Sequence, residues 1–237
     1  MKEVITFFGA DAKVGTTMLA QSFAELLAGK KARILLIFAS QEMHDSFLNL
    51  SENDCNTIDS LRDIENLKRE DIDAIIMKNG NYDYIGGIKS PFKLRCFKPT
   101  LIGEIIEIIG IDYDYVIIDG GHNYQYPLPI SSLLCATRRF FVLDQSPRSV
   151  SRFRDLDELV LKSNEFKEIG KRDKIIINKE DRKTAIYSID QITALFGRNV
   201  LSIPMVSGGR EAEANCKTFS KQKAFTNALT EVAGSIF

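Results

Sequence analysis

Short, continuously apolar segments are the feature that most restricts the fold of this chain. Three of them read ILLIF at 34–38, YVIID at 115–119 and KIIIN at 174–178. A strand covered on both faces is apolar throughout, as in parallel sheets, whereas a half-exposed strand alternates. We expect strands at Val4–Phe8, Arg33–Phe38, Ala74–Met77, Tyr115–Ile118, Phe140–Leu143, Lys174–Ile177 and Val200–Ile203, and a strand pair around Tyr82–Gly87.

Amphipathic helices are expected between these strands. One apolar stripe with helical spacing consists of Leu19, Phe23, Leu26 and Leu27, and a second consists of Phe153, Leu156, Leu159 and Val160. Residues 188–191 (SIDQ) form a capping box, and Gly197 should end the helix that follows. Alternating strands and helices predict an α/β fold with a doubly wound, mostly parallel sheet flanked by helices on both faces. Since no linker rich in Pro, Gly or Ser interrupts the chain, we expect residues 1–237 to form a single domain.

Composition excludes several classes of protein. The formal net charge is −1, from 31 basic and 32 acidic residues, so the chain has no overall attraction for nucleic acid or an anionic membrane. No stretch approaches the ~18 apolar residues of a membrane span, and no signal peptide is evident. The four cysteines are Cys55, Cys96, Cys135 and Cys216, which are too scattered for a zinc site and fit a reducing compartment. We therefore expect a cytoplasmic protein without membrane insertion.

Basic side chains concentrate in the segment from Arg138 to Arg154. Such a segment can hold DNA through its phosphates. Acidic residues interrupt it at Asp144, Asp155 and 157–158, so a solvated helix face is the favoured interpretation. Nucleic acid is accordingly not the partner we expect.

A glycine-containing turn follows the first strand. The segment VITFFGADAKVGTTMLAQSFAELLA reads as strand, turn and helix. In an α/β sheet this turn lies at the carboxyl edge, where ligands bind, and the backbone N–H groups at the helix start favour an anion. The pattern predicts a phosphate site formed by Lys13, Val14, Gly15, Thr16 and Thr17.

This segment resembles the deviant phosphate loop of the ParA/MinD family, whose pattern is KGGxGK[ST]T. In the alignment, Asp11 stands at the family's signature lysine, and Thr16 stands at its general phosphate-binding lysine. Ala12 and Lys13 replace the two glycines, whereas Thr17 keeps the hydroxyl that would ligate magnesium.

Other segments resemble the same family, in family order and across nearly the whole chain. Tyr113–Asp119 is similar to the strand YDYVIID, whose terminal aspartate lies near magnesium. Lys174–Lys179 is similar to the strand whose Asn reads adenine, which implies that role for Asn178. Residues 200–204, followed by 210–212 (REA), resemble the closing strand and its adjoining loop. The resemblance implies ATP as cofactor and a magnesium ion near Thr17 and Asp119.

The hydrolytic machinery of that family is incomplete here. The family ends its second strand LLIDxD, but this chain has Phe38 and Ser40 where the carboxylates would be. Removing one preorganised charge contact commonly costs about 3–4 kcal/mol in the transition state. Thr16 carries no charge and Asp11 would repel a phosphate, so we expect weak binding of ATP and magnesium, no catalytic residues, and little or no hydrolysis.

The hypothesis that follows is a degenerate ParA/MinD-like protein that acts as a localisation or assembly adaptor. Its VGTT sequence resembles the TadZ/CpaE branch, which implies Tad/Flp-type pilus or secretion machinery as the partner system, and a homodimer formed through the face around the loop. Two alternatives stay open. One is an active ATPase that uses Lys13, and the other is a DNA-binding partition or regulatory protein that uses Arg152 and Arg154.

Two histidines are the remaining candidates for chemistry. His122 follows Asp119-Gly-Gly at the end of a predicted strand, near the predicted ligand, and His44 lies in a less regular region. An ordinary loop histidine with backbone partners is the favoured interpretation of His122 over a catalytic base.

Overall fold

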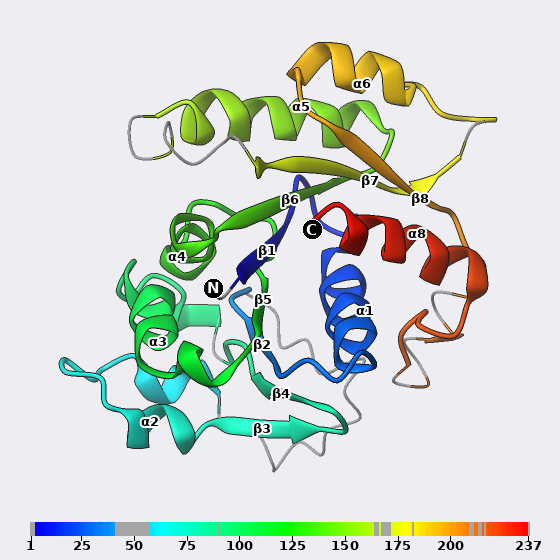
Figure 1. Ribbon diagram of the computed structural model, residues 1–237. Helices are drawn as coiled ribbons and strands as arrows, with labels where there is room; N and C mark the ends of the chain where they lie inside the picture. Colours follow the sequence, from blue (N-terminus) through cyan, green and yellow to red (C-terminus); the bar gives the residue numbers. More distant parts are fainter. Residues whose placement is uncertain are drawn as a thin grey trace.

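The computed structural model describes residues 3–40, 57–89, 91–163, 166, 172–181, 183–208, 211–212, 215 and 217–236. Predictions for His44, Cys55, Arg210 and Cys216 lie outside these residues. Eight strands form one sheet in the order β3-β4-β2-β5-β1-β6-β7-β8 (Figure 1). They are β1 (Glu3–Gly9), β2 (Ile34–Phe38), β3 (Ile76–Asn79), β4 (Tyr82–Ile85), β5 (Tyr115–Asp119), β6 (Arg138–Leu143), β7 (Lys174–Glu180) and β8 (Val200–Pro204).

The predicted α/β fold is confirmed. Every strand pair in the sheet is parallel except β3–β4, which is antiparallel at one edge. Each of the seven predicted strands overlaps an observed one, and the region around Tyr82 forms β4. The strand β2 and the residues of β5 before Asp119 are apolar without alternation, because both strands lie inside the sheet and are covered on both faces.

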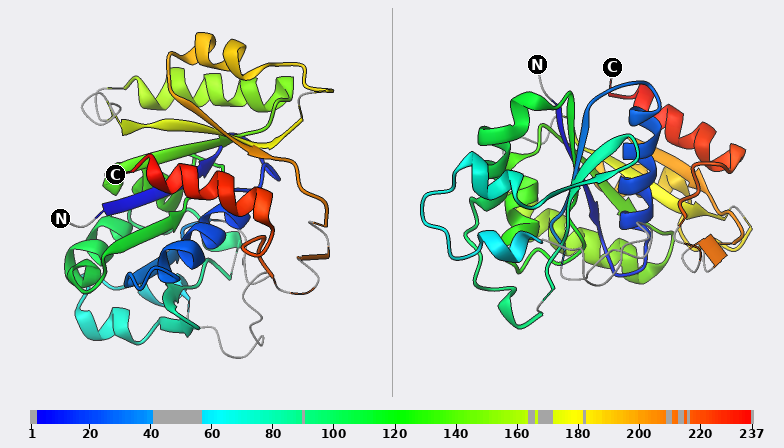
Figure 2. Two further views of the ribbon diagram at one scale, coloured as in Figure 1. Left: turned by 45° about the vertical axis from the view of Figure 1, so that its right-hand side comes forward. Right: turned by 90° about the horizontal axis from the view of Figure 1, so that it is seen from below.

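Helices cover both faces of the sheet. On one face, α1 (Thr16–Ala28) and α8 (Lys223–Gly234) pack against each other and on the strands, as Figure 2 shows. The other face is covered by α3 (Leu101–Ile109), α4 (Pro127–Cys135), α5 (Pro147–Leu156) and α6 (Ile189–Phe196), while the short α2 (Arg69–Asp73) packs on α3. Single 3-10 turns occupy Ile58–Leu61, Pro91–Lys93 and Gly110–Asp112.

A π-helical turn, Asp157–Leu161, extends α5, and one residue of the predicted apolar stripe lies outside the core because of it. Phe153 and Leu156 are buried as expected, but Leu159 is 70% exposed. A π turn holds one residue more than an α turn, so it rotates the following side chains away from the positions that 3.6-residue spacing predicts. The residue that reaches the core is Leu161 instead.

The predicted helix ends of α6 are confirmed. The Ser188 hydroxyl accepts the Gln191 backbone N–H at 3.2 Å, and the Gln191 side chain accepts the Ser188 N–H at 2.8 Å. Gly197 follows the helix with φ +61°, the left-handed conformation that glycine adopts without strain. Local sequence thus sets both ends of this element.

The interpretation of residues 138–154 as a solvated face is wrong for Arg139. Its side chain is 1% exposed and contacts Asp173, Nη1 to Oδ1, at 3.0 Å, while its Nε donates to the Leu133 carbonyl at 2.7 Å. The neighbouring Arg138 forms a partly exposed ion pair with Glu3 at 3.2 Å. Because successive residues of a strand point to opposite faces, one arginine enters the core under α4 and the other stays near the surface.

The Arg139–Asp173 pair should be important for stability. Replacing Arg139 with Met leaves the buried Asp173 carboxylate without its cation, so we expect a loss of about 3–5 kcal/mol in the free energy of unfolding. The matched change Arg138→Met should cost about 1 kcal/mol or less. Urea unfolding monitored by circular dichroism measures both values. Equal losses for the two variants would contradict this assignment.

Candidate functional site

The candidate site lies at the carboxyl edge of the sheet. The phosphate-loop candidate, residues 10–15, connects β1 to α1. The strand β1 lies between β5 and β6, and Phe7 of β1 is in register with Asp119 of β5. The order of the strands reverses around β1, and such a switch point is where open α/β sheets bind ligands.

The loop has the backbone conformation of an anion-binding turn. Lys13 and Gly15 have positive φ angles of 63° and 95°, so successive peptide groups turn in alternating directions. The helix α1 begins directly after Gly15, and its first N–H groups have no partner within the helix. Backbone amides arranged in this way attract a negatively charged group such as phosphate.

Two side chains of β7 donate hydrogen bonds to backbone carbonyls of the loop. The Asn178 amide nitrogen donates to the Val14 carbonyl at 2.7 Å, and Lys179 Nζ donates to the Lys13 carbonyl at 2.6 Å. Asn178 is 5% exposed, and a Cβ on Gly15 would lie 2.4 Å from its Nδ2. Glycine is therefore required at residue 15 both for its backbone angle and for this close approach. The adenine-binding role of Asn178 remains a prediction.

The structure brings together the two residues predicted to bind metal. The Thr17 hydroxyl donates to Asp119 Oδ2 at 2.7 Å, while Oδ1 accepts the Gly121 N–H at 3.1 Å. Asp119 is fully buried. A hydroxyl and a carboxylate are ligands suited to magnesium, which keeps several waters and is completed by phosphate oxygens. Within the described residues, no cluster of three or more His, Cys, Asp or Glu side chains could hold a metal by itself.

The two residues that replace the family's lysines have different surroundings. Thr16 is 7% exposed, and its hydroxyl lies against the backbone of Gly9, where an added Cβ would be 2.5 Å away. Asp11 accepts the Ala12 N–H at 2.8 Å and forms ion pairs with two arginines of α5, Arg148 at 2.5 Å and Arg152 at 3.3 Å. These two positions are thus occupied by a buried hydroxyl and by a carboxylate that is ion-paired with two arginines of α5.

The sequence prediction missed the Asp11–Arg148–Arg152 cluster. The spacing i, i+4 placed both arginines on one helix face, which was the only available signal. Their common partner is 137 residues away from Arg148 in sequence, and only the fold brings it near. Phe38 and Ser40, which stand where the family pattern has carboxylates, are both buried at the end of β2.

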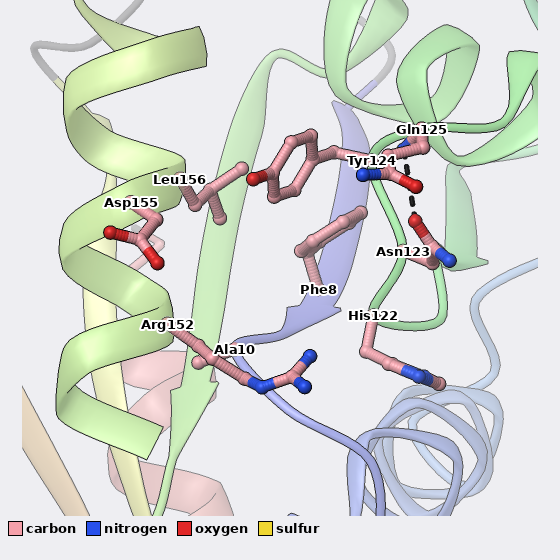
Figure 3. Close-up of a pocket in the computed structure, with 9 residues that line it drawn as sticks. All are labelled: Phe8, Ala10, His122, Asn123, Tyr124, Gln125, Arg152, Asp155 and Leu156. Atoms are coloured by element: carbon pink, nitrogen blue, oxygen red, sulfur yellow. Dashed lines mark hydrogen bonds between the residues drawn. The ribbon is translucent and has the colours of Figure 1, made fainter. Parts of the chain in front are cut away.

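A cavity of about 290 Å³ lies beside the loop, on the side of the sheet that α5 covers (Figure 3). One wall is the segment His122–Gln125, and the opposite wall is α5 with Arg152 and Asp155. Arg152 extends from α5 across the end of β1 toward the other wall. The cavity therefore adjoins the cluster at Asp11, and His122 is one of the residues that line it.

Comparison with solved structures identifies the fold. A ParA family ATPase from Chlorobium tepidum TLS superposes with a TM-score of 0.80 at 22% identity, covering 100% of this chain and 98% of that chain. The MinD protein of Pyrococcus horikoshii OT3, complexed with Mg-ADP, gives 0.76 at 14% identity over 100% and 96%. A putative plasmid partition protein from Borrelia burgdorferi B31, bound to AMPPNP, gives 0.77 at 18% identity over 100% and 98%.

The chain has the ParA/MinD fold. No protein-family model matches the sequence, and no curated protein matches it. The likeness therefore rests on tertiary structure and covers the whole chain. Among the described residues of this ParA/MinD fold, no helix is long and apolar enough to cross a membrane.

The turn after β7 contains a further acidic side chain that sequence reasoning did not single out. The Asp181 N–H donates to Gln145 Oε1 at 3.0 Å, and its carboxylate accepts the Lys183 N–H at 2.9 Å and the Thr184 hydroxyl at 2.5 Å. The hydrogen bonds from Thr184 and Lys183 hold the pKa of Asp181 below its ordinary value. Asp181 is therefore an anion at neutral pH.

The fit between Gly15 and Asn178 can be tested with a matched pair of glycines. Gly80 has φ +60° with open space around it, so Gly80→Ala should cost only the left-handed strain of about 1–2 kcal/mol. Gly15→Ala must also displace the Asn178 amide from the Val14 carbonyl, which adds about 1–3 kcal/mol for an unsatisfied buried group. Guanidinium chloride unfolding gives both numbers. If Gly15→Ala is no more harmful than Gly80→Ala, the loop is not held as described.

Proposed function

We propose that this chain is a degenerate member of the ParA/MinD family that binds nucleotide weakly and hydrolyses little or no ATP. The proposal rests on the contacts of Asp11 and Thr16, the residues that stand where the family pattern has lysines. Asp11 is engaged by Arg148 and Arg152, and Thr16 is buried against Gly9. No lysine of the phosphate loop is therefore fixed over the predicted phosphate site in the way the family pattern requires.

Electrostatics connects this arrangement to the loss of turnover. Phosphoryl transfer depends mainly on positioning the phosphates and neutralising their charge. The backbone turn, Thr17 and Asp119 support binding of phosphate and magnesium, since they need no lysine. The two positions where the family pattern has lysine supply no cation for the charge that develops in the transition state, because Thr16 is neutral and Asp11 is a carboxylate paired with Arg148 and Arg152.

We further propose an adaptor role for one domain spanning residues 1–237. The protein would form a homodimer through the face around the loop and recruit protein partners in the cytoplasm. The VGTT sequence at 14–17 supports the TadZ/CpaE branch and a Tad/Flp-type pilus or secretion system. A structure similar to this chain is described as a MinC:MinD cell division complex from Aquifex aeolicus, at 16% identity, which supports a protein partner for this fold.

The two alternative functions depend on particular basic side chains. An active ATPase requires Lys13, whose side chain is exposed at the loop. A DNA-binding role requires arginines of α5, but Arg152 is paired with Asp11, and Arg139 nearby is buried. These pairings reduce the positive charge available to phosphates and favour the adaptor proposal over DNA binding.

Calorimetry and a turnover assay test the central proposal. We expect ATP with magnesium to bind weakly, with hydrolysis no faster than that of Thr17→Ala even at high protein concentration. Thr17→Ala should weaken binding only when magnesium is present, because the hydroxyl is the predicted ligand. Substantial turnover that Thr17→Ala abolishes would contradict the proposal. If Lys13→Ala abolished that turnover as well, the Lys13-dependent ATPase would be the correct alternative.

The acidic residue of the loop gives a second test. Asp11→Asn keeps an oxygen for the Ala12 N–H but removes the negative charge and leaves Arg148 and Arg152 to face the ligand. We expect the affinity for a fluorescent ATP analogue to rise several-fold, the scale of one partly exposed charge pair. Asp155→Asn, which removes one negative charge from α5 instead of from the loop, is the control. Similar effects of both variants would show that the location of Asp11 is unimportant.

A further inference from the structure

The strand β7 ends with Asn178-Lys179-Glu180, Asp181 begins the turn that follows, and the strand end lies against the phosphate loop. The first two of these residues hold the loop through the carbonyls of Val14 and Lys13. These contacts join segments that are 164 and 166 residues apart in sequence. The end of β7 is therefore positioned directly by the part of the chain that would bind the phosphates of a nucleotide.

The end of β7 departs from the backbone of a regular strand. Lys179 has φ +59°, an angle that residues with side chains adopt rarely and at an energetic cost. The register between β7 and β8 shifts between Ile177 and Glu180. Such irregularities redirect side chains and are frequent beside functional sites. The Asp181 N–H is held by Gln145, so the turn is fixed to the ends of both β6 and β7.

Asp181 is the residue of this turn with the chemistry to recognise a base. Its carboxylate is partly exposed and ionised. Its oxygens accept hydrogen bonds from the Lys183 N–H and from the side chain and backbone of Thr184, and the two oxygens together offer about four acceptor positions. Two acceptors side by side can bind two adjacent N–H donors on one planar group.

Guanine and adenine differ in the hydrogen-bond donors that they present to a carboxylate. Guanine carries a ring N–H next to its exocyclic amino group, and the two donors match a carboxylate. Adenine presents an unprotonated ring nitrogen at the same edge, and its lone pair would repel the carboxylate. A bidentate pair of this kind discriminates between bases by about 5- to 140-fold.

We propose that the nucleotide site of this chain is selective for guanine, with the Asp181 carboxylate accepting the two N–H groups of the base and with Asn178 and Lys179 positioning the loop that binds the phosphates. The inference rests on the proposed nucleotide-binding function and names the base. It replaces the expectation that Asn178 reads adenine, and it adds a second reason for weak ATP binding.

Base preference can be measured without any mutation. Fluorescent mant-GDP and mant-ADP, each with magnesium, are titrated against the protein and followed by anisotropy. The expected result is at least about fivefold tighter binding of mant-GDP. If mant-ADP binds equally well or more tightly, the guanine inference is overturned while the nucleotide site stands. If neither binds, and GTP and ATP also fail to bind by calorimetry, the proposed nucleotide-binding function itself is wrong.

Replacing guanine by xanthine in the nucleotide tests the role of Asp181. Asp181→Asn keeps an oxygen for the Lys183 N–H but replaces one acceptor with an N–H₂ donor. Xanthine carries an oxygen where guanine carries its amino group, so this variant should lose affinity for GDP and gain affinity for xanthosine diphosphate. Asp190→Asn, an exposed carboxylate at the start of α6, is the matched control. Unchanged GDP preference in Asp181→Asn would remove Asp181 from the base site.

Discussion

The site depends on the contact between the end of β7 and the loop after β1. Asn178 and Lys179 bind the carbonyls of Val14 and Lys13, and Gly15 allows the approach because it has no side chain. These contacts fix the direction in which the loop amides point before α1 begins. A phosphate-binding turn needs this rigidity, since its amides act on an anion only when they are held in place before the anion arrives.

Asp11 is a carboxylate at the position where the family that this chain resembles has a lysine, and its pairing has a structural consequence. Asp11 is neutralised within the chain by Arg148 and Arg152, so α5 is tied to the loop through ion pairs. Half-exposed pairs of this kind contribute little to stability, but they determine which charges face a ligand. A ligand that displaces Asp11 from the arginines would also alter how α5 is held. The cavity between α5 and residues 122–125 lies at this junction.

Sequence patterns predicted the architecture well because the relevant signals are local. Continuous apolar runs identified the buried parallel strands, and the capping box at Ser188 and the glycine at residue 197 identified the ends of α6. The exposed Leu159 was mispredicted because a π turn changes the residue spacing that the pattern assumes. Arg139 was misplaced because a strand arginine can enter the core when a distant carboxylate, here Asp173, accompanies it.

By itself, the sequence predicted the succession of strands and helices and the position of the candidate phosphate loop, with Asp11 and Thr16 where the family that it resembles has lysines. Tertiary structure alone decided what those substituted residues contact. The partners of Asp11, Asn178 and Asp119 are separated from them by 137, 164 and 102 residues. Hydrogen bonds and ion pairs act over a few ångströms, so contacts across such separations exist only after the sheet has brought its carboxyl ends together, and no local pattern encodes them.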